Sequence, residues 1–255
     1  MLVKLMKHDT VSIGKLLLPL NGIVLLMGLI GAVSHFIGFF ELENVGPLVG
    51  ALSSTYVIGL AVIMVVSYFY PIIHFYRNLF STQGYLTFTL PVCSWKILFS
   101  KTIASFGWYL VNIVVALFSL WAVTGFYRLP SGHIVVINAY LIEEIGMGFA
   151  TFMGWMFGIT FFSLLWSLLT AFFSICVGQL FAKHKIIASV GAYIVIYTLV
   201  QILVTAMFIP FIFSAPGIHT VVIVSFYSTI LFSVVFSVLF YLGSGMILKK
   251  KVNLD

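Results

Sequence analysis

The chain has 255 residues, of which 62% are hydrophobic and only 7% are charged, and its mean hydropathy is +1.22. A soluble domain carries roughly 25% charged residues, because water must wet its surface. A chain so poor in charge has no material for a water-facing shell, so we expect lipid to contact most of its surface. The sequence contains no long polar stretch, which leaves no room for a separate soluble domain.

The net charge of +6 is distributed in short basic clusters at the ends of apolar runs. Such clusters attract anionic lipid headgroups and orient a protein in the membrane. Nucleic-acid binding would need a dense basic stripe, which is absent from the sequence. The two cysteines, Cys93 and Cys176, are far apart and match neither a disulfide framework nor a zinc-site spacing, so we interpret both as reduced structural thiols.

Six apolar runs are long enough to cross a bilayer, which takes ~20 residues of helix. The sequence therefore predicts an all-α membrane protein with one transmembrane domain over residues 1–255. A signal peptide is the alternative for the first run, but its 25 residues exceed the apolar stretch of about 7–15 that a signal peptide has. The predicted spans are residues 16–40, 50–75, 97–125, 148–181, 186–209 and 221–248.

The fourth run is longer than one perpendicular crossing needs, so we expect one of its ends to lie in the membrane interface. The mildly amphipathic segment Ile134–Ile145 before it is expected there too. Glu143 and Glu144 argue against counting that segment as a seventh span, because carboxylates are costly inside a membrane.

The basic residues orient the predicted spans. With six spans, eleven of the twelve Lys and Arg residues fall on one side, and Arg128 alone falls on the other with Glu41, Glu43, Glu143 and Glu144. The positive-inside rule places the basic side, and with it both termini, in the cytoplasm of a cell membrane. The eleven are Lys4, Lys7, Lys15, Arg77, Lys96, Lys101, Lys183, Lys185, Lys249, Lys250 and Lys251.

The segment before the first span is compatible with a short helix in the cytoplasmic interface. Its apolar residues can share one helical face, with the basic residues opposite. An ordinary basic flank explains the same residues equally well, so both interpretations stay open. The apolar set is Leu2, Leu5, Met6 and Ile13, and the basic set is Lys4, Lys7 and His8.

Ionisable residues are missing from the interior of the predicted spans, whereas ion-coupled carriers usually hold them there. The deepest polar groups are Asn21, Asn112, Gln179 and Gln201. Amides at such positions are more typical of helix packing than of ligand binding. Asn21, Asn112 and Gln201 are nevertheless the candidates for polar residues along a transport path.

Sequence motifs of enzymes are also missing. The chain has no Gly-x-x-x-x-Gly-Lys-Ser/Thr loop for a nucleotide, no Gly-x-Ser-x-Gly or His-Glu-x-x-His motif, and no histidine pair at metal-ligand spacing. We therefore expect no catalytic residue, no metal site and no cofactor in this chain. Energy for any transport must come from another chain.

Small residues recur at every fourth position near the start of the fourth span. They are Gly146, Ala150, Gly154 and Gly158. Small residues at this spacing let another backbone approach closely. We expect this groove to pack inside the chain, which we favour over a seam between two copies.

The predicted cytoplasmic loop from His74 to Lys96 is long and rich in Phe, Tyr and Leu. A simple connection would be short and polar. Apolar groups in such a loop indicate docking to a membrane surface or to another protein. Gly84 permits a sharp turn, and Pro91 ends local helix.

The residues of this loop resemble bacterial ABC-2 type permeases. The resemblance is carried by Phe75–Phe80, Gly84–Pro91, Lys96 and Lys101, and it extends to the opening Lys4–Asp9, to Leu18–Leu20 and to the six-span layout. It implies a permease subunit that pairs with a second permease copy or paralogue and with two cytoplasmic ATPase subunits, which bind ATP and Mg. In size and layout the chain is similar to small permeases of amphipathic-peptide exporters, such as the phenol-soluble modulin exporter.

The same resemblance implies that the segment after the second span is a coupling helix seated on the ATPase, and that the N-terminal segment is the family's interfacial connecting helix. Ser81-Thr82-Gln83 departs from the pattern, since an acidic residue is expected before Gly84. The implied coupling residues are Arg77, Asn78, Leu79, Phe80, Gln83, Gly84, Tyr85 and Leu86.

The preferred function is therefore the permease subunit of an ABC exporter for amphipathic or hydrophobic peptides. A self-sufficient secondary transporter is one alternative, disfavoured by the lack of intramembrane charge. A membrane scaffold or immunity protein that needs no ATPase is the other.

Overall fold

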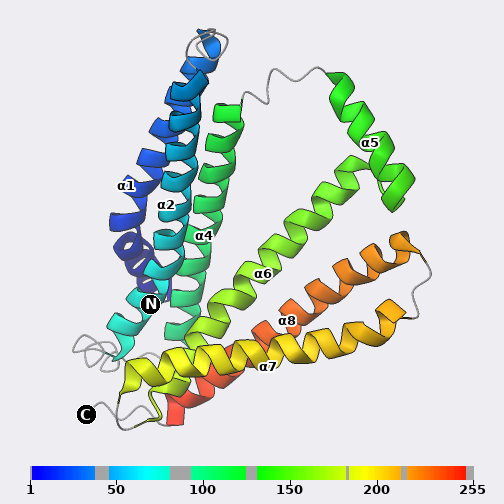
Figure 1. Ribbon diagram of the computed structural model, residues 1–255. Coiled ribbons are helices and arrows are strands. Elements are labelled where there is room, and N and C mark those ends of the chain that lie inside the picture. The colour runs from blue at the N-terminus through cyan, green and yellow to red at the C-terminus, as the bar shows by residue number, and fades with distance from the viewer. Residues whose placement is uncertain are drawn as a thin grey trace. The chain divides into compact units, whose positions relative to one another are not determined.

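The computed structural model describes residues 2–37, 46–80, 93–124, 131–181, 184–213 and 217–250. The regular elements in these ranges are all α-helices (Figure 1). They are α1 (Leu2–Phe36), α2 (Gly46–Phe80), α4 (Ser94–Thr124), α5 (Ser131–Ile145), α6 (Phe149–Gly178), α7 (Lys185–Phe213) and α8 (Ile218–Lys250).

Six of these helices are long and apolar enough to cross a membrane, and α5, with 15 residues, is the short one. The prediction of an all-α protein with six spans is confirmed to this extent. Large apolar side chains lie on the outer surface, for example Leu18 at 66% exposed and Ile187 at 70%. Lipid as the solvent explains this surface, and helices satisfy their own backbone groups there. The chain is a multi-pass membrane protein.

Two helix boundaries differ most from the predicted spans. The first helix begins at Leu2 rather than at residue 16, so the N-terminal segment continues directly into the span. The second helix continues to Phe80, so the first residues of the predicted loop are helical. The predicted coupling helix begins after the second span, and its first residues, up to Phe80, continue α2. Its remainder, on residues 81–92, lies outside the described residues.

The chain divides into two compact units. The first consists of Met1–His74 and Ile103–Pro130, and the second of Phe75–Thr102 and Ser131–Asp255. The division cuts α2 and α4, so that the end of α2 and the start of α4 belong with α6, α7 and α8.

In the first unit, α1 and the later part of α4 approach each other closely. A Cβ atom added at Gly28 would lie 2.7 Å from the Oγ of Ser119 and 3.0 Å from its Cα, so only glycine fits there. Ser119 donates a hydrogen bond from Oγ to the carbonyl of Val24 (3.0 Å) and accepts one from the Tyr56 hydroxyl (2.8 Å). One buried serine thus links α1, α2 and α4, and small residues make this contact possible.

The N-terminal part of α1 is packed inside this unit. Ile13 and Leu17 are 1% and 0% exposed and pack with Ala104 of α4. The indole N–H of Trp108 donates to the carbonyl of Thr10 (2.9 Å), and Ser12 and His74 share a hydrogen bond of 2.9 Å. Of the apolar face that the sequence predicts for this segment, Ile13 therefore packs against α4.

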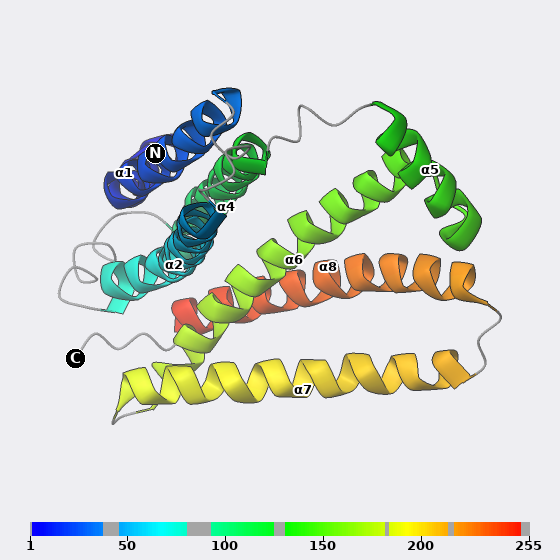
Figure 2. The ribbon, with the colours of Figure 1, turned by 45° about the horizontal axis from the view of Figure 1, so that its top comes forward.

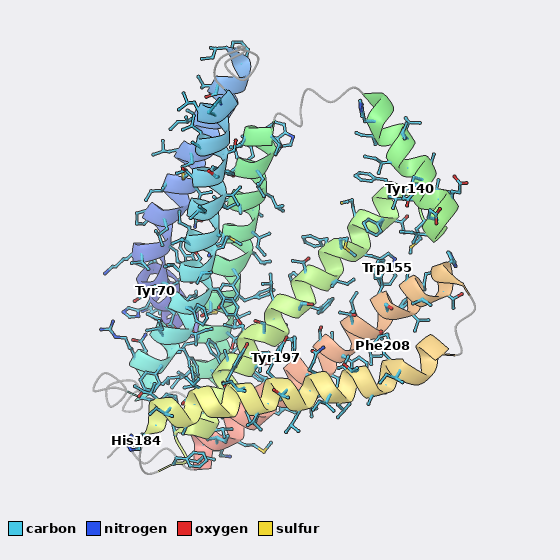
Figure 3. The ribbon with its side chains drawn as sticks, viewed as in Figure 1. Tyr70, Tyr140, Trp155, His184, Tyr197 and Phe208 are labelled. Carbon is cyan, nitrogen blue, oxygen red and sulfur yellow. The ribbon has the colours of Figure 1, made fainter. Side chains whose placement is uncertain are left out.

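In the second unit, α6 lies against both α7 and α8, while α5 contacts α6 and α8 (Figures 1 and 2). Phe173 of α6 stacks on Phe240 of α8 with ring centroids 5.1 Å apart. Nearer the other end of α6, Trp155 meets Tyr227 edge to face at 4.6 Å (Figure 3). Aromatic contacts thus hold α6 and α8 together along their length.

The junction between α5 and α6 depends on a glycine. Gly146 has φ of +71°, a left-handed conformation that glycine adopts without steric cost. The side chain of Asn138 then accepts a hydrogen bond of 2.7 Å from the backbone N–H of Phe149, at the start of α6. Because Gly146 precedes α6, it does not belong to the small-residue face that the sequence predicts on this helix.

Candidate coupling surface and polar cavities

The last turn of α2 carries four of the predicted coupling residues, and their side chains face in different directions. Arg77 is exposed, Asn78 and Phe80 are half-buried, and Leu79 is 0% exposed. Leu79 is therefore part of the internal packing of the second unit. The other predicted coupling residues, Gln83, Gly84, Tyr85 and Leu86, lie outside the described residues.

A flat aromatic stack fixes this end of α2 to α6. The rings of Phe75 and Phe172 are parallel to within 10°, with centroids 3.8 Å apart, and both side chains are buried. Phe80 meets Phe75 edge to face at 6.3 Å. Such pairs contribute about 0.5–1.5 kcal/mol beyond the burial of their area. Sequence reasoning missed Phe172, since no local pattern relates it to Phe75.

The start of α4 is fixed to α8 in a comparable way. A Cβ atom added at Gly245 would overlap the six-membered ring of Trp95. The Tyr241 hydroxyl donates to the Trp95 carbonyl (3.2 Å), and the two rings lie 5.6 Å apart. Trp95, Tyr241 and Gly245 were not predicted as functional residues. The Gly-x-Gly pair at Gly243 and Gly245 is the signal in the sequence that marks a close contact on α8.

Basic side chains lie on the surface at these helix ends. Arg77, Lys96 and Lys249 are exposed, and His184 begins the approach to α7 with φ of 55° (Figure 3). Lys101, which belongs to the family-like motif, is 4% exposed and faces inward. The described part of this end therefore combines exposed cations with a firmly packed aromatic interior.

The three polar residues predicted along a transport path, Asn21, Asn112 and Gln201, do not all lie in the same unit. Asn21 donates a hydrogen bond of 2.7 Å to the Oδ1 of Asn112, and both residues are buried in the first unit. Among the described residues, the Nδ2 of Asn112 has no further partner. Gln201 belongs to the second unit and lines a small cavity of about 150 Å³ with Trp166 and Ser233. The asparagine pair has the geometry of a helix-packing contact.

The small residues of α6 make few contacts inside the second unit. Ala150 and Gly154 are exposed, and a Cβ atom at Gly154 would meet nothing within 4 Å. A Cβ atom at Gly158 would lie 3.5 Å from the Cδ1 of Ile230 on α8. Of the predicted small-residue set, Gly146 is the other glycine with a neighbour on α8, because a Cβ atom there would overlap the ring of His219.

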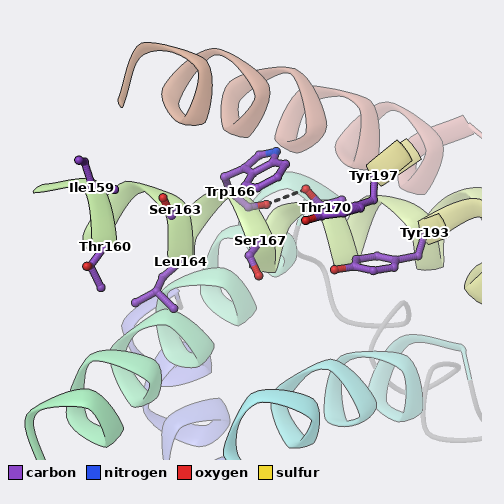
Figure 4. A pocket seen from close by; sticks show the side chains of 9 residues that line it. All are labelled: Ile159, Thr160, Ser163, Leu164, Trp166, Ser167, Thr170, Tyr193 and Tyr197. Atoms are coloured by element: carbon purple, nitrogen blue, oxygen red, sulfur yellow. Dashed lines mark hydrogen bonds between the residues drawn. The ribbon is translucent and has the colours of Figure 1, made fainter. Parts of the chain in front are cut away.

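A larger cavity of about 550 Å³ lies along α6 and α7 (Figure 4). Its walls are rich in hydroxyl groups, which sequence reasoning missed. Those on α6 recur at intervals of three and four residues, the spacing of one helical face, and this spacing is the signal that could have located them. The lining residues are Ile159, Thr160, Ser163, Leu164, Trp166, Ser167, Thr170, Tyr193 and Tyr197.

Comparison with protein families, with curated proteins and with solved structures found no match to this chain.

Proposed function

We propose that this chain is the transmembrane permease subunit of an ATP-driven ABC exporter. In this assignment it works with two cytoplasmic ATPase subunits and with a second permease, either another copy or a paralogue. ATP and Mg are bound by the ATPase. The membrane is the cell membrane, and both termini are cytoplasmic.

The observation that supports this proposal best is the fixation of both flanks of residues 81–92. On one side the Phe75–Phe172 stack joins the end of α2 to α6, and on the other Trp95 is seated on Gly245 of α8. Because packed side chains in a helical core deform little, a push on the intervening segment would move α6 and α8 together with it. A permease without a nucleotide site needs such a contact to respond to ATP.

Arg77 and Phe80 are the described residues that are placed to make the contact itself. Arg77 is exposed, and Phe80, one turn beyond Tyr76, is half-buried. Both lie on the end of α2 that the Phe75–Phe172 stack joins to α6. An exposed guanidinium suits an acidic partner surface, and an aromatic anchor at an interface contributes ~2 kcal/mol or more.

The proposed cargo is an amphipathic or hydrophobic peptide that moves outward. The family resemblance and the lack of charged residues in the middle of the spans support this choice. Selective ATP-driven movement of a hydrophilic sugar or an inorganic ion would contradict it.

The test is purification of the tagged chain from its own membranes, with identification of the retained proteins and measurement of ATP hydrolysis. We expect an ABC ATPase to be retained, and native mass spectrometry should count two permeases and two ATPases. Phe80→Ala and Arg77→Ala should each lower ATPase retention or coupled hydrolysis roughly tenfold, the effect of a lost interface anchor.

Phe157→Ala is the matched control, because Phe157 is 71% exposed on α6 and lies outside the proposed contact. It should leave retention unchanged. If both α2 variants behave like this control while expression is equal, the coupling assignment is wrong. Transport by the chain without any ATPase would instead identify a secondary transporter.

A further inference from the structure

The 550 Å³ cavity of the second unit has a definite chemical character. Four hydroxyl-bearing residues of α6 and two tyrosines of α7 line it, and none of its nine lining residues is charged. Figure 4 shows the Ser167 hydroxyl and the Trp166 ring on opposite sides of α6, with Tyr193 and Tyr197 beside Thr170. A cavity of this volume is within the ordinary range for small ligands, ~300–1,000 Å³.

The threonine hydroxyls in this wall are available as acceptors. Thr160 donates its hydroxyl hydrogen to the carbonyl of Met156, and Thr170 donates to that of Trp166, both at 2.8 Å. A hydroxyl has one hydrogen to donate and two lone pairs. Both threonines therefore present lone pairs only, which favours a ligand that donates hydrogen bonds.

Aromatic rings from α7 and α6 also line the cavity. Tyr193 and Tyr197 are stacked with centroids 6.1 Å apart, and Trp166 continues the series at 6.1 Å from Tyr197. The faces and hydroxyl oxygens of such rings attract cations. Since the lining contains no Lys, Arg or His, a phosphate or carboxylate would find no positive charge to pair with.

The position along the helices also suits a cation. Thr170 lies eight residues before the end of α6, and Tyr193 lies eight residues after the start of α7, which places each ~12 Å from its helix end. A charged group at this depth stays near the interface, while its alkyl stem can run deeper along Leu164 and Ile159. A cavity with polar walls can also hold water around the charge.

We propose that this cavity binds a primary alkylammonium group. Thr170 accepts a hydrogen bond from the ammonium group, or from water around it, and Tyr193 and Tyr197 provide the cation–π surface. The group can come from a lysine side chain of an amphipathic peptide or from the amine of a phosphatidylethanolamine headgroup. A role for the cavity in binding cargo rests on the proposed export function. Binding of the ammonium group does not depend on that function.

The test is titration of the purified full-length chain with hexylammonium and with hexanol, followed by tryptophan fluorescence. We expect hexylammonium to bind at least tenfold more tightly than hexanol. Tyr193→Leu with Tyr197→Leu should weaken hexylammonium binding about 5- to 30-fold. Thr170→Val, which keeps the shape of the side chain, should weaken it at least fivefold.

Tyr140→Leu and Thr151→Val are matched controls, since Tyr140 is 62% exposed on α5 and Thr151 is an exposed threonine of α6 that does not line the cavity. Both should bind hexylammonium like the natural chain. The proposal is overturned if hexanol binds equally well, or if the controls lose as much affinity as the cavity variants. Should the tyrosine pair fail to fold, Thr170→Val decides the question alone.

Two further titrations in nanodiscs separate the sources of the ammonium group. An amphipathic peptide with lysine is compared with the same peptide carrying norleucine, and phosphatidylethanolamine is compared with phosphatidylcholine as the lipid. A preference for the lysine peptide identifies cargo, and a preference for phosphatidylethanolamine identifies lipid. These measurements need no ATPase. The ammonium site can therefore be wrong while the exporter assignment is right, and the exporter assignment can be wrong while the ammonium site is right.

Discussion

Single polar residues in the spans of this chain are satisfied mainly within the membrane-embedded protein. The hydroxyls of Thr102, Ser225 and Ser244 donate to the carbonyl four residues earlier in the same helix. Asn21 and Asn112 instead bind each other across two helices. A polar residue inside a span therefore indicates a transport path only when it also faces open space, as Tyr193 and Thr170 do at the cavity.

The asparagine pair allows a direct test of this interpretation. Asn21→Leu and Asn112→Leu should each lower the free energy of unfolding by ~1 kcal/mol, because each removes a buried hydrogen bond and leaves the partner amide unpaired. The double variant should cost less than the sum of the two. The measurement is reversible unfolding in mixed micelles of SDS and a mild detergent.

Val24→Ala in the same helix is a control for lost packing, because it removes buried apolar atoms without touching the pair. When Val24→Ala is combined with either asparagine variant, the two losses in free energy of unfolding should add in full. If the asparagine variants abolish transport while their stability stays unchanged, the pair is part of the path after all.

At the scale of whole helices, apolar length was sufficient to predict the six spans, because each must cross the same bilayer. The helix ends were predicted less well, since they depend on partners distant in sequence. The segment before residue 16 continues into α1 and packs on Trp108 and Ala104 of α4. An amphipathic pattern is the same whether its apolar face meets lipid or another helix, so the sequence alone left this open.

The contact of α4 with α8 was beyond sequence reasoning for the same reason. Trp95 and Gly245 are separated by 150 positions in the sequence, and no local pattern links them. The aromatic loop, in contrast, was recognisable from its composition. Its apolar residues divide in the structure between internal packing, as with Leu79, and a more accessible position, as with Phe80.

Gly245→Ala tests whether this helix contact is as tight as the geometry indicates. The added methyl group would overlap the Trp95 ring, so we expect a loss of ~1–3 kcal/mol in unfolding free energy, the usual cost of overpacking. Trp95→Leu removes the ring atoms concerned and should restore part of the loss when combined with Gly245→Ala. The same SDS unfolding assay measures both.

Gly191→Ala on α7 is the matched control, because a Cβ atom there would meet nothing within 4 Å. It should raise stability by up to ~1 kcal/mol, since alanine favours helix over glycine by about that amount at an exposed site. Equal losses for Gly245→Ala and Gly191→Ala would show that the close contact is absent.

At the scale of the whole molecule, the number of spans and the basic residues together predict which side of the membrane each connection faces. An even number of crossings returns the chain to the side on which it started, and eleven of twelve basic residues then share that side. The positive-inside rule depends on such Lys and Arg asymmetry close to the ends of the spans. The connection before α4 and the helix α5 should therefore lie on opposite faces of the membrane.

The two natural cysteines make this last prediction testable with little engineering. Cys93 is exposed just before α4, whereas Cys176 is 0% exposed in α6 and should not react. A membrane-impermeant maleimide should label Cys93 only after the cytoplasmic face is opened to it. In a Cys93→Ser background, Gly132→Cys on the exposed surface of α5 should react in intact cells.

Reporter fusions at the C-terminus and in the 129–134 region should likewise report opposite sides of the membrane. Labelling of both cysteine positions from one side would require an even number of crossings between them, and the arrangement with α4 as a single span from the cytoplasm to α5 would then be wrong.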